Sequence, residues 1–224
     1  MSGTNVIHHA GETTSPVAGN GVAPPAPATQ PTPTAASSIA DPAALGLAAF
    51  AMTTFVLSVV NAGLIQSAAT PVVLGLALFY GGIAQLFAGM WEFRRGNVFG
   101  AVAFSSYGAF WLSFFFYVDF VAGGLAKVGE ANAATGLFLL AWAIFTGYMM
   151  IAAFRTNMAV LLVFVFLFLT YVALVIGAWG GIEVVNKVGG WLGIVTAVIA
   201  WYTSFAIVLN STFKKTLLPL GPLE

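Results

Sequence analysis

Residues Met158 to Ala178 read MAVLLVFVFLFLTYVALVIGA, an apolar stretch without a single charged side chain. About 20 apolar residues in a helix span the hydrocarbon core of a bilayer, so this stretch predicts a transmembrane helix. Five further apolar stretches of similar length flank it within residues 41–212. We therefore predict an all-α membrane protein with six transmembrane helices, at about 42–66, 71–93, 98–121, 135–154, 158–178 and 187–210.

The composition also indicates an integral membrane protein. Apolar residues make up 60% of the chain and charged residues 6%, whereas a soluble domain carries about 25% charged residues. A net charge of zero gives no basic surface for nucleic acid. The chain has no cysteine, and both histidines, His8 and His9, lie near the N-terminus, so we expect no metal site and no cofactor. No nucleophile has a base in reach, so we expect no enzyme.

The two ends of the chain are predicted to lie outside the membrane. Residues 1–40 are rich in Pro, Ala and Thr and are expected to be a disordered tail. Residues 213–224 are expected to form a short cytoplasmic tail. Basic residues are concentrated in the loops on the side of both termini, which places the termini in the cytoplasm of a cell (plasma or inner) membrane. The residues on that side are Arg94, Arg95, Arg155, Lys214 and Lys215, against Lys127 and Lys187 on the other.

Polar residues inside the expected helices are candidates for the wall of a pathway. A side-chain amide in hydrocarbon needs a hydrogen-bond partner or water, which makes Asn61 and Gln85 the strongest candidates. A hydroxyl can instead bond to its own helix, and Gln85 can tie two helices together, so this alternative stays open. The central turns carry no charged residue, so we expect no proton relay, and Glu92 is expected to pair at the headgroups. The candidates are Thr53, Thr54, Ser58, Asn61, Gln85 and Ser106.

Glycines recur every seven residues in the second expected helix, at Gly75, Gly82 and Gly89. Small residues let helices approach closely in lipid, so this stripe predicts tight helix packing. Packing within the chain is the favoured interpretation, and contact with a neighbouring subunit is the alternative.

Three segments resemble one transporter family. They are FYGGIAQLFAG at residues 79–89, AFSSYGAFW at residues 103–111, and DPAALGL at residues 41–47. Together with Gly190-Trp191 and the C-terminal residues from Asn210, they are similar to the acetate uptake transporter family, also called the succinate–acetate permeases. The similarity covers nearly everything after residue 40.

The resemblance implies a six-helix protomer, assembled as a homo-hexamer in the lipid bilayer, with a narrow uncharged pathway through each subunit. The implied substrate is acetate, with succinate or other short carboxylates beside it and protons as a candidate partner. The implied waist consists of Phe50, Tyr107 and Leu167, flanked by Thr53, Thr54, Asn61 and Gln85. The implied mouth on the cytoplasmic side carries the family signature at Asp41, Pro42, Leu45 and Gly46.

Two positions depart from that signature: Asp41 stands where the family has Asn, and Ala44 stands where it has a second Pro. A carboxylate at the mouth would repel an incoming anion, although the N-terminal dipole of the first helix offsets part of this repulsion.

Free energies limit how a carboxylate can cross a dry waist. Neutralising a carboxylate with a pKa near that of Glu costs roughly 3.7 kcal/mol at pH 7. Passing the bare anion through an apolar constriction would cost tens of kcal/mol. Either the substrate carries its own proton, or water and hydroxyl donors such as Tyr107 stay with it, so an anion channel and a proton-coupled permease both remain open. The rival interpretations are a pore for another small solute, such as ammonia, and a non-transporting membrane scaffold or sensor.

Overall fold

The computed structural model describes residues 39–223, whose regular elements are all helical. Six apolar segments are long enough to cross a membrane, which confirms the predicted number of transmembrane helices. Eight α-helices and three short segments of other helical type build them. The elements are α1 (Ala43–Asn61), η1 (Ser67–Ala69), α2 (Val72–Leu78), η2 (Phe79–Ala84), α3 (Gln85–Arg95), α4 (Val98–Phe116), η3 (Tyr117–Val121), α5 (Ala122–Lys127), α6 (Ala131–Ala153), α7 (Met158–Gly180) and α8 (Glu183–Phe213).

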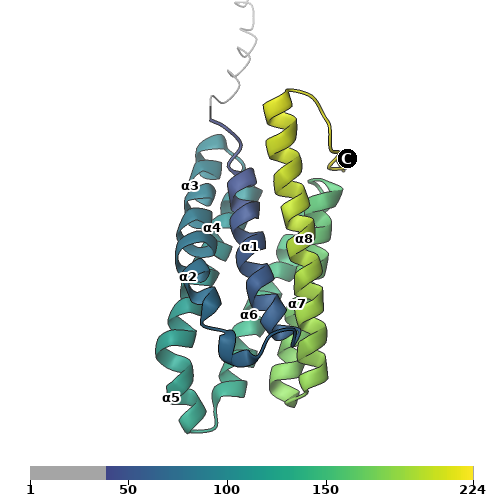
Figure 1. The fold of residues 1–224 in the computed structure, drawn as a ribbon. Helices are drawn as coiled ribbons and strands as arrows, with labels where there is room; N and C mark the ends of the chain where they lie inside the picture. Colours follow the sequence, from purple (N-terminus) through teal and green to yellow (C-terminus); the bar gives the residue numbers. More distant parts are fainter. Residues whose placement is uncertain (1–38, 224) are drawn as a thin grey trace, which may run out of the picture. The chain divides into compact units, whose positions relative to one another are not determined.

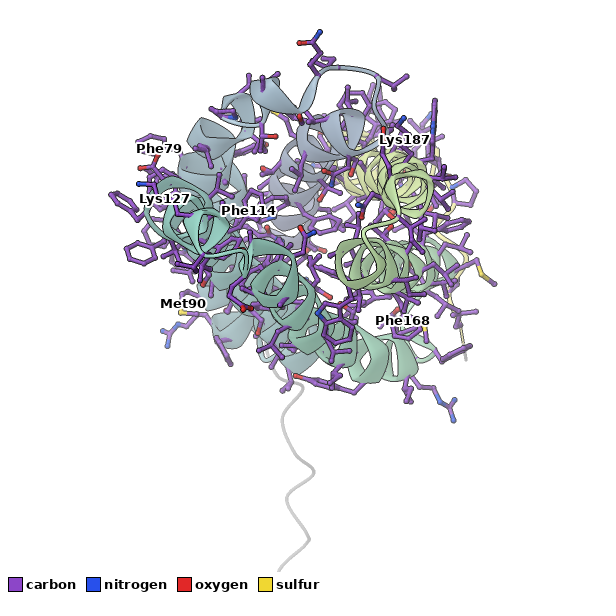
Figure 2. The ribbon with its side chains drawn as sticks, turned by 90° about the horizontal axis from the view of Figure 1, so that it is seen from below. Phe79, Met90, Phe114, Lys127, Phe168 and Lys187 are labelled. Atoms are coloured by element: carbon purple, nitrogen blue, oxygen red, sulfur yellow. The ribbon has the colours of Figure 1, made fainter. Side chains whose placement is uncertain are left out.

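The six spans run alternately up and down, so that α1 begins and α8 ends at the same end of the bundle (Figure 1). Helix α8 packs against both α1 and α7, α6 packs against α7, and α3 packs against α4. Large apolar side chains cover the outside, as expected for a surface that faces lipid. Seen from the end opposite the termini, Phe79 and Met90 lie on the outer edge, whereas Phe114 lies within the ring of helices (Figure 2).

The second span is not the continuous α-helix that its sequence predicts. It changes to the wider π-helical winding over η2 and returns to α-helix at Gln85. Gly81 and Gly82 are buried in this segment, and a Cβ on Gly81 would lie 2.6 Å from Thr53 Oγ1. The glycines therefore let η2 pack directly on α1 and α4, and π-helical turns of this kind are frequent at functional sites.

Several helix ends differ from their predicted positions. Helix α1 ends at Asn61 rather than near residue 66, because Gly63 adopts the left-handed conformation (φ 76°) that ends the helical path. The third span continues through α5 to Lys127, and the fourth begins at Ala131. The last span is longer than predicted at both ends, from Glu183 to Phe213. It starts early because Gly181 (φ 61°) reverses the chain and α8 begins two residues later.

The glycine stripe of the second span divides into two parts. A Cβ on Gly89 would collide with Ser105 of α4, and one on Gly82 would collide with Leu112 of the same helix. A Cβ on Gly75 would meet nothing within 4 Å. Gly82 and Gly89 thus serve packing within the chain.

The residues after α8 fold back over the start of α7. Met158 N donates to Gly221 O at 2.6 Å and Ala159 N donates to Leu220 O at 3.1 Å. These bonds satisfy two of the N–H groups that the first turn of α7 leaves without a helical partner. Asn210 holds the segment in place by accepting from Leu217 N and Leu218 N and donating to Leu218 O. The predicted C-terminal tail is therefore a packed part of the bundle.

Candidate functional site

Two cavities enter the bundle from its opposite ends and meet in the middle. The near vestibule, of about 450 Å³, lies at the end where α1 begins and reaches inward from Asp41 and Asn157 to Tyr107. The far vestibule, of about 750 Å³, reaches inward from Gln66 and Lys187. Phe50 and Leu167 belong to the walls of both cavities. The two vestibules together therefore trace a path along the bundle with a narrow point at these two residues.

All three residues of the predicted waist lie at this narrow point. Phe50, Tyr107 and Leu167 are each at most 4% exposed. The Phe50 and Tyr107 rings pack with their centroids 5.7 Å apart. Tyr107 also packs edge-on against Phe145. The constriction is therefore lined by carbon, and an unsolvated anion would lose its hydration there without compensation.

The hydroxyl of Tyr107 has no proton to spare for a substrate. Its oxygen lies 2.9 Å from Thr146 Oγ1, and Thr146 donates its only hydroxyl proton to Trp142 O at 2.7 Å. Tyr107 must therefore donate to Thr146, which leaves only a lone pair on the Tyr107 oxygen. The expectation that Tyr107 donates to a passing anion does not fit this arrangement. A neutral acid, which carries its own O–H, could donate to that oxygen.

Three of the predicted polar residues line the far vestibule. Thr54, Ser58 and Asn61 follow Phe50 along α1, and all three belong to its wall. Thr54 Oγ1 is enclosed and has no hydrogen-bond partner within the described chain. The indole Nε1 of Trp111, which lines the same vestibule, also lacks a partner there. These unpaired groups beside the waist are available to a ligand's oxygen atoms.

The other predicted polar residues divide between the near vestibule and the protein interior. Gln85 lines the near vestibule, is 1% exposed, and its Oε1 has no partner among the described residues. Thr53 lines neither cavity, and its hydroxyl donates to Ala49 O at 2.9 Å. For this residue the alternative interpretation, a hydroxyl bonded to its own helix, therefore fits the structure. Ser106 also lines neither cavity.

Of the four predicted mouth residues, Asp41 belongs to the wall of the near vestibule, whereas Pro42, Leu45 and Gly46 do not. Ala43 and Leu47 of the same signature segment also line it. Asp41 Oδ1 accepts from Ala43 N at 2.9 Å and so helps to cap α1. The carbonyl of Pro42 accepts from Gly46 N in the first turn. A Cβ on Gly46 would lie 2.6 Å from the Phe104 ring, so this glycine lets α1 approach α4. Leu45 is exposed on the outside of the bundle.

Glu92 does not lie among the headgroups as expected. Its side chain is 0% exposed and lines the near vestibule. Asn97 Nδ2 donates to Glu92 Oε2 at 3.0 Å, while Asn97 Oδ1 caps α4 by accepting from Gly100 N. Gly96, in the left-handed conformation (φ 78°), turns the chain so that α4 folds back over α3. This corner encloses the carboxylate because Gly100 has no side chain to occupy its place.

Charge at the mouth of the near vestibule comes from three residues. Arg95 Nη1 lies 2.8 Å from Asp41 Oδ1 and 3.6 Å from Glu92 Oε2. Asp41, which departs from the family signature, thus forms a salt bridge with Arg95. This ion pair reduces the repulsion that the Asp41 carboxylate was expected to exert on an incoming anion. At the far vestibule, Lys187 pairs with Glu183 at 2.7 Å. Within residues 39–223 no cluster of three metal-ligating side chains occurs.

Further aromatic residues of the pathway were not assigned from the sequence. Phe110 and Tyr171 line the far vestibule directly beyond the waist, with ring centroids 5.9 Å apart. Phe164 lines the near vestibule and packs against Tyr107. The available signal was helical spacing, since Tyr171 lies one turn after Leu167 and Phe164 nearly one turn before it.

Comparison with known proteins decides the family. The model of the GPR1/FUN34/yaaH family matches residues 25–223. The chain belongs to this family. The succinate-acetate/proton symporter SatP of Escherichia coli is 37% identical over 183 residues, which cover 82% of this chain and 96% of that protein. The solved structure of the bacterial acetate channel SatP superimposes with a TM-score of 0.73 at 34% identity and covers 82% of this chain and 99% of its own.

A third similar family member is named for the transport of a different solute. The ammonia transport outward protein 2 of Saccharomyces cerevisiae is 40% identical over 171 residues, which cover 75% of this chain. The chain spans about 60% of the length of the yeast relatives that it matches. Family membership and the six apolar helices make this chain a multi-pass protein of the cell membrane.

Proposed function

We propose that this protein carries acetate and other short monocarboxylates across the cell membrane through the path formed by the two vestibules. The observation that carries the proposal is the pair of cavities that meet at Phe50 and Leu167. The relatives support the choice of substrate, because two of them bear acetate in their names. We infer no enzymatic activity, because the similar proteins are named as a symporter and a channel.

The waist favours passage of the neutral acid. Its wall is apolar, and the hydroxyl of Tyr107 is engaged with Thr146 as a donor. Neutralising acetate at pH 7 costs roughly 3.7 kcal/mol, far less than the tens of kcal/mol for a bare anion in a dry constriction. Succinate has two carboxylates to neutralise, so its passage costs about twice as much. We therefore propose acetate as the preferred substrate and succinate as a slower one.

Uptake of radiolabelled acetate into proteoliposomes tests this proposal. We expect saturable uptake above that of empty liposomes, inhibited by propionate and not by benzoate, which is too bulky for the waist. Wild-type protein that moves no acetate would contradict the transport function and favour a scaffold or sensor.

Ammonia is the second candidate substrate, because one similar relative bears ammonia transport in its name. An uncharged waist with unpaired hydroxyl and amide groups beside it also suits ammonia. Measuring methylammonium uptake with and without acetate separates the two: competition would indicate a shared path, and methylammonium uptake without acetate uptake would favour ammonia.

We also propose a homo-oligomer with cytoplasmic termini. The resemblance to the family supports a hexamer, and the open surface at Gly75 offers a close approach for a neighbouring helix. Basic loops at the end that carries both termini support the orientation. Mass measurement of the detergent-solubilised protein and protease access to the termini in sealed vesicles are the respective tests.

A further inference from the structure

Glu92 is a carboxyl group enclosed in the wall of the near vestibule, with one oxygen unused. Its Oε2 accepts from Asn97 Nδ2, whereas its Oε1 has no hydrogen-bond partner among the described residues. An enclosed polar atom without a partner costs free energy, and this cost is removed when the oxygen binds a proton or meets a donor. The side chain belongs to the wall of the vestibule through which we propose that acetate enters.

The charges that face Glu92 are few. The segment before α1 contributes Asp41, and α3 contributes Arg95. Helix α4 and its cap contribute the neutral Gly100 and Asn97, and the turn before α7 adds the neutral Thr156 and Asn157 to the same vestibule. With both carboxylates ionised, this group of three charged residues has a net charge of −1.

Arg95 is shared by the two carboxylates through a single nitrogen. Both salt-bridge distances, 2.8 Å to Asp41 and 3.6 Å to Glu92, involve Nη1. A guanidinium has five N–H donors in a planar fork, so its other donors can receive an incoming carboxylate. An anion bound there adds negative charge next to Glu92, and a proton on Glu92 would compensate it.

The order of groups along the vestibule also fits a proton transfer before the waist. Glu92 and Gln85 lie seven residues apart on α3, so they face the same direction. Both line the vestibule, with Gln85 beside the end that Tyr107 closes. A substrate would thus pass Arg95 and Glu92 while still anionic and reach Gln85 and the waist afterwards.

We propose that Glu92 is the proton donor that converts the carboxylate substrate into its neutral acid within the near vestibule. The O–H bond on Glu92 Oε1 breaks and a new O–H bond forms on the acetate oxygen, which gives acetic acid and the Glu92 carboxylate. A proton from the solution outside the vestibule then binds to the Glu92 carboxylate, so that the net reaction consumes one solution proton for each acetate. This step is a single transfer at the mouth and needs no relay across the membrane. It rests on the proposed transport of acetate.

The pH dependence of acetate uptake into proteoliposomes tests this assignment. In Glu92→Gln, which keeps the side-chain shape, only acid already protonated in bulk water can cross, so uptake should fall about tenfold for each pH unit above 5.5. The wild type should fall less steeply and should exceed the variant roughly tenfold at pH 7. Asp119→Asn, in η3, removes one negative charge outside both vestibules and serves as the matched control: its pH slope should equal that of the wild type.

Each outcome decides between the alternatives. Parallel slopes in the wild type and Glu92→Gln would overturn the assignment, as would an equal change of slope in Asp119→Asn. An assembled Glu92→Gln protein inactive at every pH would also overturn it, because bulk acetic acid should still pass the waist. Wild-type protein without saturable uptake would instead refute the proposed function.

Chemical labelling of the wild-type protein tests the same assignment if the Glu92→Gln variant fails to assemble. Carbodiimides react with protonated carboxyl groups, so dicyclohexylcarbodiimide should label the peptide that contains Glu92 at pH 5.5. The bulky adduct on Glu92 should also block acetate uptake, because Glu92 lines the vestibule through which we propose that acetate enters. An unlabelled Glu92 peptide, or labelling that leaves acetate uptake unchanged, would overturn the assignment.

Discussion

Phe50 of α1 and Leu167 of α7 line both vestibules, although each of their helices packs mainly against α8. The two side chains therefore come from different helices and lie where the two cavities meet. Residues in such a position set the size of the solute that passes.

Shortening either waist residue should admit larger acids. Phe50→Ala and Leu167→Ala should raise uptake of propionate relative to acetate about tenfold, as expected when a size-selective contact is removed. Initial uptake rates of labelled propionate and labelled acetate in proteoliposomes measure the change. Phe79→Ala is the matched control because Phe79 lies on the outer edge of the bundle (Figure 2). Unchanged selectivity in both waist variants would remove these residues from the mechanism.

Tyr107 should act through its ring more than through its hydroxyl. In Tyr107→Phe the ring still fills the waist, and Thr146 keeps its bond to Trp142 O. Acetate uptake should therefore stay within about fivefold of wild type, since one buried hydrogen bond contributes about 1 kcal/mol. Tyr107→Ala removes the ring and should abolish discrimination against propionate. Measuring initial rates for both variants checks this. Tyr107→Phe as damaging as Tyr107→Ala would show that the hydroxyl itself serves the substrate.

The sequence predicted much of this architecture because bilayer thickness determines helix length. Six apolar stretches gave six spans, and the small residues that let helices approach were recognisable from their spacing. The π-helical segment η2 was not predicted, because an apolar stretch with paired glycines is compatible with several helical windings. The first helix was predicted too long because the residues after Asn61 are also apolar, and only the left-handed Gly63 ends it.

The candidate site was less accessible to sequence reasoning. Because Arg94 and Arg95 follow Glu92 closely in the sequence, Glu92 was predicted to lie at the membrane surface. In the structure, the turn at Gly96 and Asn97 folds α4 over Glu92 and encloses its carboxylate. Burial of this kind depends on contacts between helices, which helical spacing does not specify. Hydroxyl groups posed a similar problem: Thr53 and Thr54 are adjacent, yet only Thr54 lines a vestibule.

Replacing Asp41 by Asn should strengthen the capture of acetate. The carboxylate of Asp41 occupies Arg95 Nη1 at 2.8 Å, where a substrate carboxylate would otherwise bind. Both side chains are partly exposed, so the pair contributes at most about 1 kcal/mol, which corresponds to a KM for acetate about fivefold lower in Asp41→Asn. Concentration dependence of initial uptake measures this value. Asp119→Asn, in η3, controls for a general loss of one negative charge, and a higher KM in Asp41→Asn would contradict the prediction.

Helix packing around α8 should be least tolerant at Gly190. A Cβ there would collide with the backbone of Ala62, whereas a Cβ on Gly75 would meet nothing within 4 Å. Gly190→Ala should therefore destabilise the protein by about 1–3 kcal/mol, the usual cost of overpacking. In an isolated protomer, Gly75→Ala should be neutral or slightly stabilising, because Ala has a helix propensity up to about 1 kcal/mol better than Gly. Thermal unfolding in detergent, followed by tryptophan fluorescence, compares the two. A larger loss at Gly75 would indicate that this surface is covered by a neighbouring subunit, which the oligomer's mass would then report.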